Sequence, residues 1–108
     1  MKSIAPLLAL SLCLAVATAA DAADPNLARN LARNLAATCA GCHGTDGRSA
    51  GGMASLAGVP QRALMEKLRA FRAGEQPATI MHQIAKGYSD EQLSLITAYF
   101  AGLDARQP

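Results

Sequence analysis

The stretch CAGCH, Cys39 to His43, constrains this chain of 108 residues more than any other feature. On a helix its two cysteines and its histidine would lie within about one turn. The only other cysteine in the sequence is Cys13, inside an apolar N-terminal run. Three kinds of site use such a group: a redox dithiol, part of a zinc site, or the attachment point of a covalently bound haem.

The N-terminal residues predict a secretory signal peptide. A basic start at Lys2 is followed by the nearly uninterrupted apolar run Ile4 to Val16 and then by small residues. The run is too short to span a bilayer, as is typical of a cleaved signal. We expect cleavage after Ala22, with Ala19 and Ala20 as alternative sites. Residues 1–22 are then the signal, and residues 23–108 form one periplasmic domain without a membrane span.

Charge and size narrow the function further. Ten Lys or Arg against eight Asp or Glu give a net charge of +2, which is too small an excess to predict binding to nucleic acid. A domain this small has a modest core, and such domains often depend on a disulfide, a metal or a large cofactor.

Hydrophobic periodicity predicts an all-α fold of about four helices, with no convincing strand. Asp24 and Pro25 are typical of a helix start. Leu27, Leu31 and Leu35 recur every four residues and predict the apolar face of one helix that runs into CAGCH. The glycine-rich segment 44–58 is expected to be a loop, and covering a cofactor is a reason for its length.

The second expected helix begins at Pro60 and stops at Gly74. Leu64, Leu68 and Phe71 share one face, and Met65 beside them is expected to pack in the core. The basic residues of this helix are expected on other, solvated faces: Arg62, Lys67, Arg69 and Arg72.

Two further helices are expected near the C-terminus. A short one precedes Gly87. The last begins at Ser89, because Gln92 three residues later gives the spacing of a capping box. Its broad apolar face consists of Leu93, Ile96, Tyr99, Phe100 and Leu103.

These patterns discriminate among the three kinds of cysteine site. A thioredoxin-like dithiol follows a strand in an α/β unit, and no strand is predicted here. A structural zinc site needs four ligands, so His82 would have to join Cys39, Cys42 and His43. C-x-x-C-H is itself the haem-attachment signature, since two thiols on one turn can bond the two vinyl groups of one haem. The predicted signal, helices and covering loop favour covalent attachment of haem.

Three stretches resemble class I cytochrome c domains: LAATCAGCHGTDG, SLAGVP and TIMHQIAKGYSDEQLSLITAYFAGL. The last is especially similar to the cytochrome subunit of flavocytochrome c sulfide dehydrogenases. The resemblance covers nearly all of residues 23–108. It implies a small fold wrapped around one covalently bound haem c, with Cys39 and Cys42 as thioether sites and His43 as the proximal iron ligand. It also implies Met81 as the distal iron ligand.

The same resemblance implies that the first and last helices cross, with Ala32 and Ala36 allowing close approach of Tyr99 and Phe100. Many relatives have a proline where this chain has Ala54, and its carbonyl accepts a hydrogen bond from the proximal imidazole. Ala54 retains a carbonyl, so we expect the bond to form, but the chain lacks the rigidity of proline there.

From the residues alone, the candidates for the sixth iron ligand are Met53, Met65, Met81 and His82. Met53 follows His43 too closely to reach the opposite face of the haem easily, and Met65 is expected in the core. Met81 is favoured, because enough chain lies between it and His43 to wrap around the cofactor. His82 and an open site remain alternatives.

The sixth ligand decides the expected function. A thioether raises the reduction potential, and a filled coordination sphere leaves no place for a substrate. The sequence therefore predicts a periplasmic electron carrier with redox protein partners, rather than an enzyme. A flavoprotein subunit that oxidises sulfide is one such partner. The alternative is a haem enzyme or sensor with an exchangeable sixth ligand, such as a peroxidase or a gas-binding protein.

Overall fold

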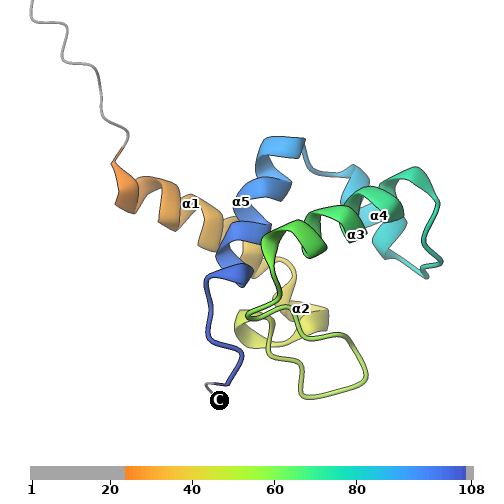
Figure 1. Cartoon of the computed structure of the whole chain (residues 1–108), viewed down its shortest axis with the longest axis horizontal. Coiled ribbons are helices and arrows are strands. Elements are labelled where there is room, and N and C mark those ends of the chain that lie inside the picture. Colours follow the sequence, from red (N-terminus) through yellow and green to blue (C-terminus); the bar gives the residue numbers. More distant parts are fainter. Residues whose placement is uncertain (1–23, 107–108) are drawn as a thin grey trace, which may run out of the picture.

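The computed structural model describes residues 24–106 (Figure 1). The expected signal peptide, residues 1–22, lies outside the described residues. Within 24–106 the chain forms five α-helices and one short 3₁₀-helix, and no strand. These elements are α1 (Pro25–Ala37), α2 (Ala40–His43), η1 (Thr45–Gly47), α3 (Gln61–Ala73), α4 (Met81–Lys86) and α5 (Asp90–Ala101). The all-α expectation is confirmed.

The first expected helix is divided into α1 and α2, so the expectation of a single helix running into CAGCH is wrong. α1 begins as expected, because the Asp24 carboxylate accepts from the Asn26 amide at 2.9 Å. At its end the Thr38 hydroxyl donates to the Leu35 carbonyl at 2.9 Å, and the Cys39 amide bonds Ala36, three residues back. These bonds tighten the backbone, and a new helix starts after Cys39.

The predicted ends of the later helices are confirmed. Gly74 terminates α3 in the left-handed conformation, with φ of 76°. Ser89 and Gln92 make both bonds of the capping box at the start of α5: the Ser89 hydroxyl accepts from the Gln92 amide at 3.2 Å, and the Gln92 side chain accepts from the Ser89 amide at 2.9 Å.

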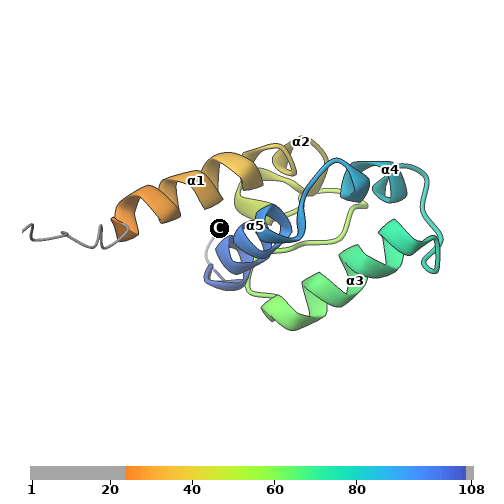
Figure 2. The same ribbon diagram turned by 90° about the horizontal axis from the view of Figure 1, so that it is seen from above.

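α1 crosses α5, as Figures 1 and 2 show, and this confirms the implied crossing of the first and last helices. The contact is made by Ala32 and Ala36, which are both buried, and Ala36 belongs to the same core cluster as Phe100. Leu27 and Leu31 are 68% and 49% exposed, and of the leucine repeat only Leu35 packs against the core. A repeat of four drifts around a helix of 3.6 residues per turn, and α1 extends beyond the other helices.

The core lies between α1, α3 and α5. It contains Ala36, Leu64, Ile96 and Phe100, and Met65 is buried beside it, as expected. Thr97 is also buried, and its hydroxyl donates to the Leu93 carbonyl at 2.8 Å. That bond satisfies the donor, which allows a polar residue on the inner face of α5.

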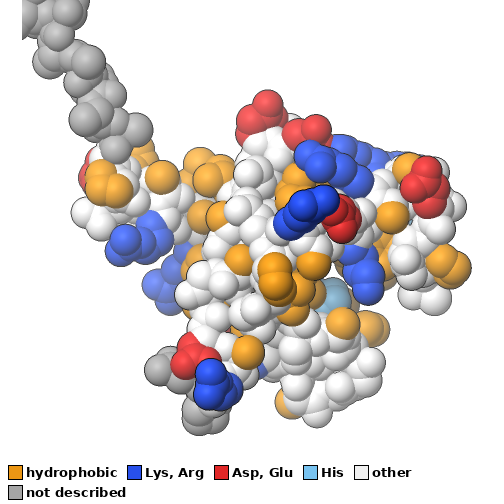
Figure 3. All heavy atoms as spheres, in the orientation of Figure 1, with side chains coloured by type: hydrophobic (Ala, Val, Ile, Leu, Met, Phe, Trp, Pro, Cys, Tyr) orange, Lys and Arg blue, Asp and Glu red, His pale blue; other side chains and the backbone are white. Residues whose placement is uncertain are grey.

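Charged side chains meet at the surface over the start of α5 and the C-terminal half of α3 (Figure 3). Arg72 donates a hydrogen bond to Asp90, and this contact lowers the pKa of the Asp90 carboxyl. Among residues 24–106, no helix has the length and apolar character needed to cross a membrane.

Candidate functional site

A partly open cavity of about 480 Å³ lies beside α2, α3, α4 and α5. This volume lies within the range of about 300–1,000 Å³ that is typical of small-molecule and cofactor sites. Side chains from α3, α5 and the glycine-rich loop form its apolar wall: Leu56, Leu64, Leu68, Phe71, Ile96 and Phe100. The helices that make the core therefore also build one side of the cavity.

All four site residues named from the sequence line this cavity. Cys39, Cys42 and His43 come from α2 and the residue before it, and Met81 is the first residue of α4. Segments far apart in the sequence thus present two thiols, an imidazole and a thioether to one space.

The other candidates for the sixth ligand lie differently. Met65 packs in the core and does not line the cavity, whereas Met53 lines it and is 53% exposed. His82 is half-buried but is not among the residues that line the cavity. The first turn of α4 therefore places Met81, and not its neighbour His82, in the cavity wall.

The His43 ring is oriented by the backbone of the glycine-rich loop. Its Nδ1 lies 2.6 Å from the Ala54 carbonyl oxygen. A carbonyl can only accept, so Nδ1 must carry the proton and donate it. The lone pair of the neutral ring is then on Nε2, the nitrogen available to a metal ion. The hydrogen bond expected at Ala54 is present even though that residue is not proline.

The two cysteines are free thiols, with Cys39 partly buried and Cys42 exposed. Burial raises the pKa of the Cys39 thiol, against a smaller opposite effect of its hydrogen bond to Thr38. Within 24–106, no three side chains among His, Cys, Asp and Glu are placed to hold one metal ion. The zinc hypothesis requires such a group, and the dithiol hypothesis requires strands.

Two features of the site were not predicted. The hydroxyls of Thr38 and Tyr88, both at the cavity, lie 2.7 Å apart. Thr38 uses its own proton for Leu35, so Tyr88 is the donor. No local pattern indicates a contact between residues so far apart in sequence.

Lys67 is the second unpredicted feature. Its side chain is exposed, as expected, but it also lines the cavity and so shares the face of α3 that carries Leu64 and Phe71. Lys67 lies three residues after Leu64 and four before Phe71, and this helical spacing could have placed it there.

The cavity fits a haem attached through CAGCH. An apolar wall suits the porphyrin, the two thiols lie beside the imidazole, and the orientation of His43 leaves Nε2 free for iron. Met81 supplies a second possible ligand from a different helix.

Known proteins are similar to this chain in sequence. The cytochrome subunit of sulfide dehydrogenase from Chlorobaculum tepidum is 39% identical over 69 residues, covering 64% of this chain and 63% of that protein. The thiosulfate dehydrogenase electron acceptor from Thiomonas intermedia is 36% identical over 69 residues, covering 62% of this chain and 32% of that protein. Cytochrome c-554(548) from Halomonas halodenitrificans is 37% identical over 71 residues, covering 59% of this chain and 82% of that protein.

The chain thus spans less than two thirds of the first two of these relatives. The family model for cytochrome c matches residues 28–104, which include CAGCH, Met81 and all of α5. On this match the chain belongs to the cytochrome c family, whose members carry covalently bound haem c.

Proposed function

We propose that the protein is a single-haem electron carrier of the periplasm, with Cys39 and Cys42 as thioether sites and His43 and Met81 as iron ligands. One observation carries the proposal: these four side chains line a single apolar cavity. The names of the relatives add support, since one is a cytochrome subunit and another an electron acceptor.

Each residue has a definite task in this proposal. The sulfur atoms of Cys39 and Cys42 would form the two thioether bonds that fix the cofactor to the chain. His43 offers Nε2 while the Ala54 carbonyl holds Nδ1–H, which fixes the ring and raises its basicity. Met81 offers its thioether from α4. When bound, the haem supplies a one-electron ferric–ferrous couple.

The surroundings favour transfer of electrons over chemistry on a substrate. Most of the residues that line the cavity are apolar, and an apolar environment together with a thioether ligand raises the reduction potential. With His43 and Met81 both committed as ligands, no position is left for a substrate. The protein therefore acts as a carrier and not as an enzyme.

The ligand assignment is tested by the optical spectrum of the ferric protein. We expect a weak far-red sulfur-to-iron charge-transfer band that is abolished by Met81→Leu. Met53→Leu is the matched control, because it removes the other methionine that lines the cavity. Retention of the band in Met81→Leu would contradict the assignment. Tight binding of carbon monoxide to the reduced wild-type protein would favour an exchangeable sixth ligand, as in a haem enzyme or sensor.

The partner is a redox protein, and a flavin-containing subunit is the one favoured by the similarity to a sulfide dehydrogenase subunit. The protein would accept electrons from the flavin and would not act on sulfide itself. Purification of the native protein tests this, because a flavin-containing chain should accompany it. The mass of the same sample tests removal of residues 1–22.

A further inference from the structure

We propose that Asp46, Arg48 and Tyr99 form a clamp that positions the Ala54 carbonyl for its hydrogen bond to His43. The clamp would supply the restraint that a proline at position 54 would give through its fixed φ. The inference rests on the proposed role of His43 as an iron ligand. The three clamp residues would act through Ala54 and would not touch the cofactor, so they are positioning residues.

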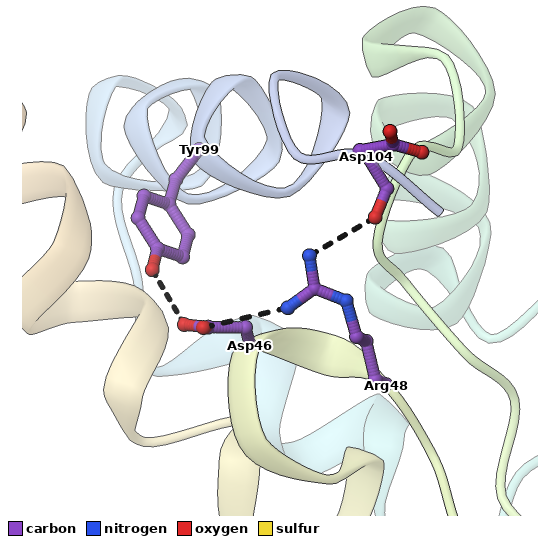
Figure 4. Close-up of polar contacts among 4 residues, drawn as sticks. All are labelled: Asp46, Arg48, Tyr99 and Asp104. Atoms are coloured by element: carbon purple, nitrogen blue, oxygen red, sulfur yellow. Dashed lines mark hydrogen bonds and ion pairs between the residues drawn. The ribbon is translucent and has the colours of Figure 1, made fainter. Parts of the chain in front are cut away.

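The clamp joins the start of the glycine-rich loop to α5 (Figure 4). The Tyr99 hydroxyl donates to one carboxylate oxygen of Asp46 at 2.7 Å. Arg48 donates to the other oxygen at 3.5 Å, and its second terminal nitrogen donates to the Asp104 carbonyl at 3.0 Å. Asp46 is thus held between a side chain of α5 and an arginine that is itself tied to the segment after α5.

The backbone of Asp46 depends on this arrangement. Its φ of 53° is the only positive value among the non-glycine residues that the structure describes. The left-handed region is uncommon for residues with a side chain, although aspartate and asparagine tolerate it better than most. The bonds from Tyr99 and Arg48 engage both carboxylate oxygens and so favour this conformation over others open to the loop.

The position of Asp46 reaches Ala54 through the hydrogen bonds that close the loop. Gly47, the next residue, accepts from the amides of Leu56 at 2.7 Å and Ala57 at 3.3 Å. The Ser49 amide donates to the Ser55 hydroxyl at 3.0 Å. Residues 55 and 56, immediately after Ala54, are therefore tied to the segment that the clamp holds.

The tip of the loop has only local hydrogen bonds: the Ser49 hydroxyl bonds the amide and the carbonyl of Gly51, both at 3.3 Å. Gly51 and Gly52 have no atom within 4 Å of the position of a Cβ, and Ala54 is exposed. A flexible loop tip would let the Ala54 carbonyl leave His43. The clamp and the closing bonds are what the structure provides against that motion.

The primary test is Tyr99→Phe in the haem-loaded protein, because phenylalanine keeps the ring that packs edge-on against Phe100. Exchange of the His43 Nδ1 proton with solvent should become about two- to tenfold faster, the usual effect of weakening one hydrogen bond. A weaker bond makes the imidazole less basic and the ferric state less stable. A threefold shift toward ferrous iron would raise the potential by about 30 mV, at ~59 mV per tenfold for one electron.

Ala54→Pro supplies the rescue. In that background Tyr99→Phe should change neither the exchange rate nor the potential, because the proline restrains the carbonyl without the clamp. Tyr88→Phe is the matched control, since it removes the other tyrosine hydroxyl, which bonds Thr38 and not the loop. Tyr88→Phe should change the proton exchange and the reduction potential by the same amount whether residue 54 is alanine or proline.

The outcomes separate cleanly. Loss of stability in Tyr99→Phe with unchanged proton exchange and potential would overturn the clamp and leave a purely structural contact. Changes that Ala54→Pro does not rescue would overturn the route through the loop. If Ala54→Pro fails to mature, Asp46→Asn replaces it, and its effect combined with Tyr99→Phe should not exceed the larger single effect. If the proposed function is wrong, the wild-type protein itself will lack a covalent-haem spectrum, before any variant is compared.

Discussion

Replacing Gly47 by alanine should destabilise the base of the glycine-rich loop by about 2–4 kcal/mol. The φ of Gly47 is 71°, a left-handed conformation that costs a residue with a side chain about 1–2 kcal/mol. A Cβ there would lie 2.8 Å from the Phe100 ring and 2.9 Å from the Leu56 Cβ. Overpacking of this kind adds about 1–3 kcal/mol to the destabilisation. Alanine also lowers the conformational entropy of the unfolded chain, which offsets about 0.4–1 kcal/mol.

Two other glycines separate these contributions. Gly74 has a similar φ of 76° but no atom within 4 Å of its Cβ position, so Gly74→Ala should cost only the backbone part, about 1 kcal/mol. Gly51 has neither feature, and Gly51→Ala should change the stability by less than about 0.5 kcal/mol.

Urea unfolding of the three haem-loaded variants, followed by circular dichroism, measures the differences in their free energies of unfolding. The comparison requires that the dependence of this free energy on urea concentration has a similar slope in each variant. A Gly47→Ala protein no less stable than Gly74→Ala would refute the contact with Phe100 as a rigid limit on this position.

Two predictions concern the tyrosines. Tyr88→Phe should cost about 0.5–1.5 kcal/mol, and Thr38→Val should cost more, because it also removes the hydrogen bond to the Leu35 carbonyl. The double variant should cost clearly less than the sum of the two, because both changes remove the bond between the hydroxyls; an additive result would show that the hydroxyls do not interact in solution. The hydrogen bond to Asp46 raises the pKa of Tyr99, with a further contribution from burial, so the folded chain keeps this proton above pH 10, where the unfolded chain loses it. The stabilisation is complete below about pH 10 and is lost as the pH rises through the folded pKa. Unfolding between pH 9 and 11 should therefore be less pH-dependent in Tyr99→Phe than in the wild type, and equal slopes would contradict this.

Local signals were sufficient where one turn of chain determines the structure. Pro60 and Gly74 bound α3, and the capping box of Ser89 and Gln92 starts α5, as their spacing predicts. The division between α1 and α2 depends instead on the side chain of Thr38, which competes with the helix for the Leu35 carbonyl. The spacing of the hydrophobic residues does not change at Thr38, so it could not predict where α1 ends.

Contacts between segments that are distant in sequence could not be predicted from the spacing of residues. Leu27 and Leu31 have the pattern of a buried face, yet the place where α5 crosses α1 decides that the alanines are buried instead. Asp46 and Tyr99 show no sequence relationship, because their bond exists only when η1 and α5 lie together. The cavity itself was expected only through CAGCH, whose chemistry requires a large group near His43.

The crossing of α1 and α5 also bears on when the cofactor can be attached. Ile96 and Phe100, both on α5, form part of the cavity wall, so this wall is complete only when α5 has docked on α1. A chain in which α5 has not yet docked would leave Cys39 and Cys42 beside a cavity that is open on that side. We therefore expect haem to be attached before or together with the docking of α5.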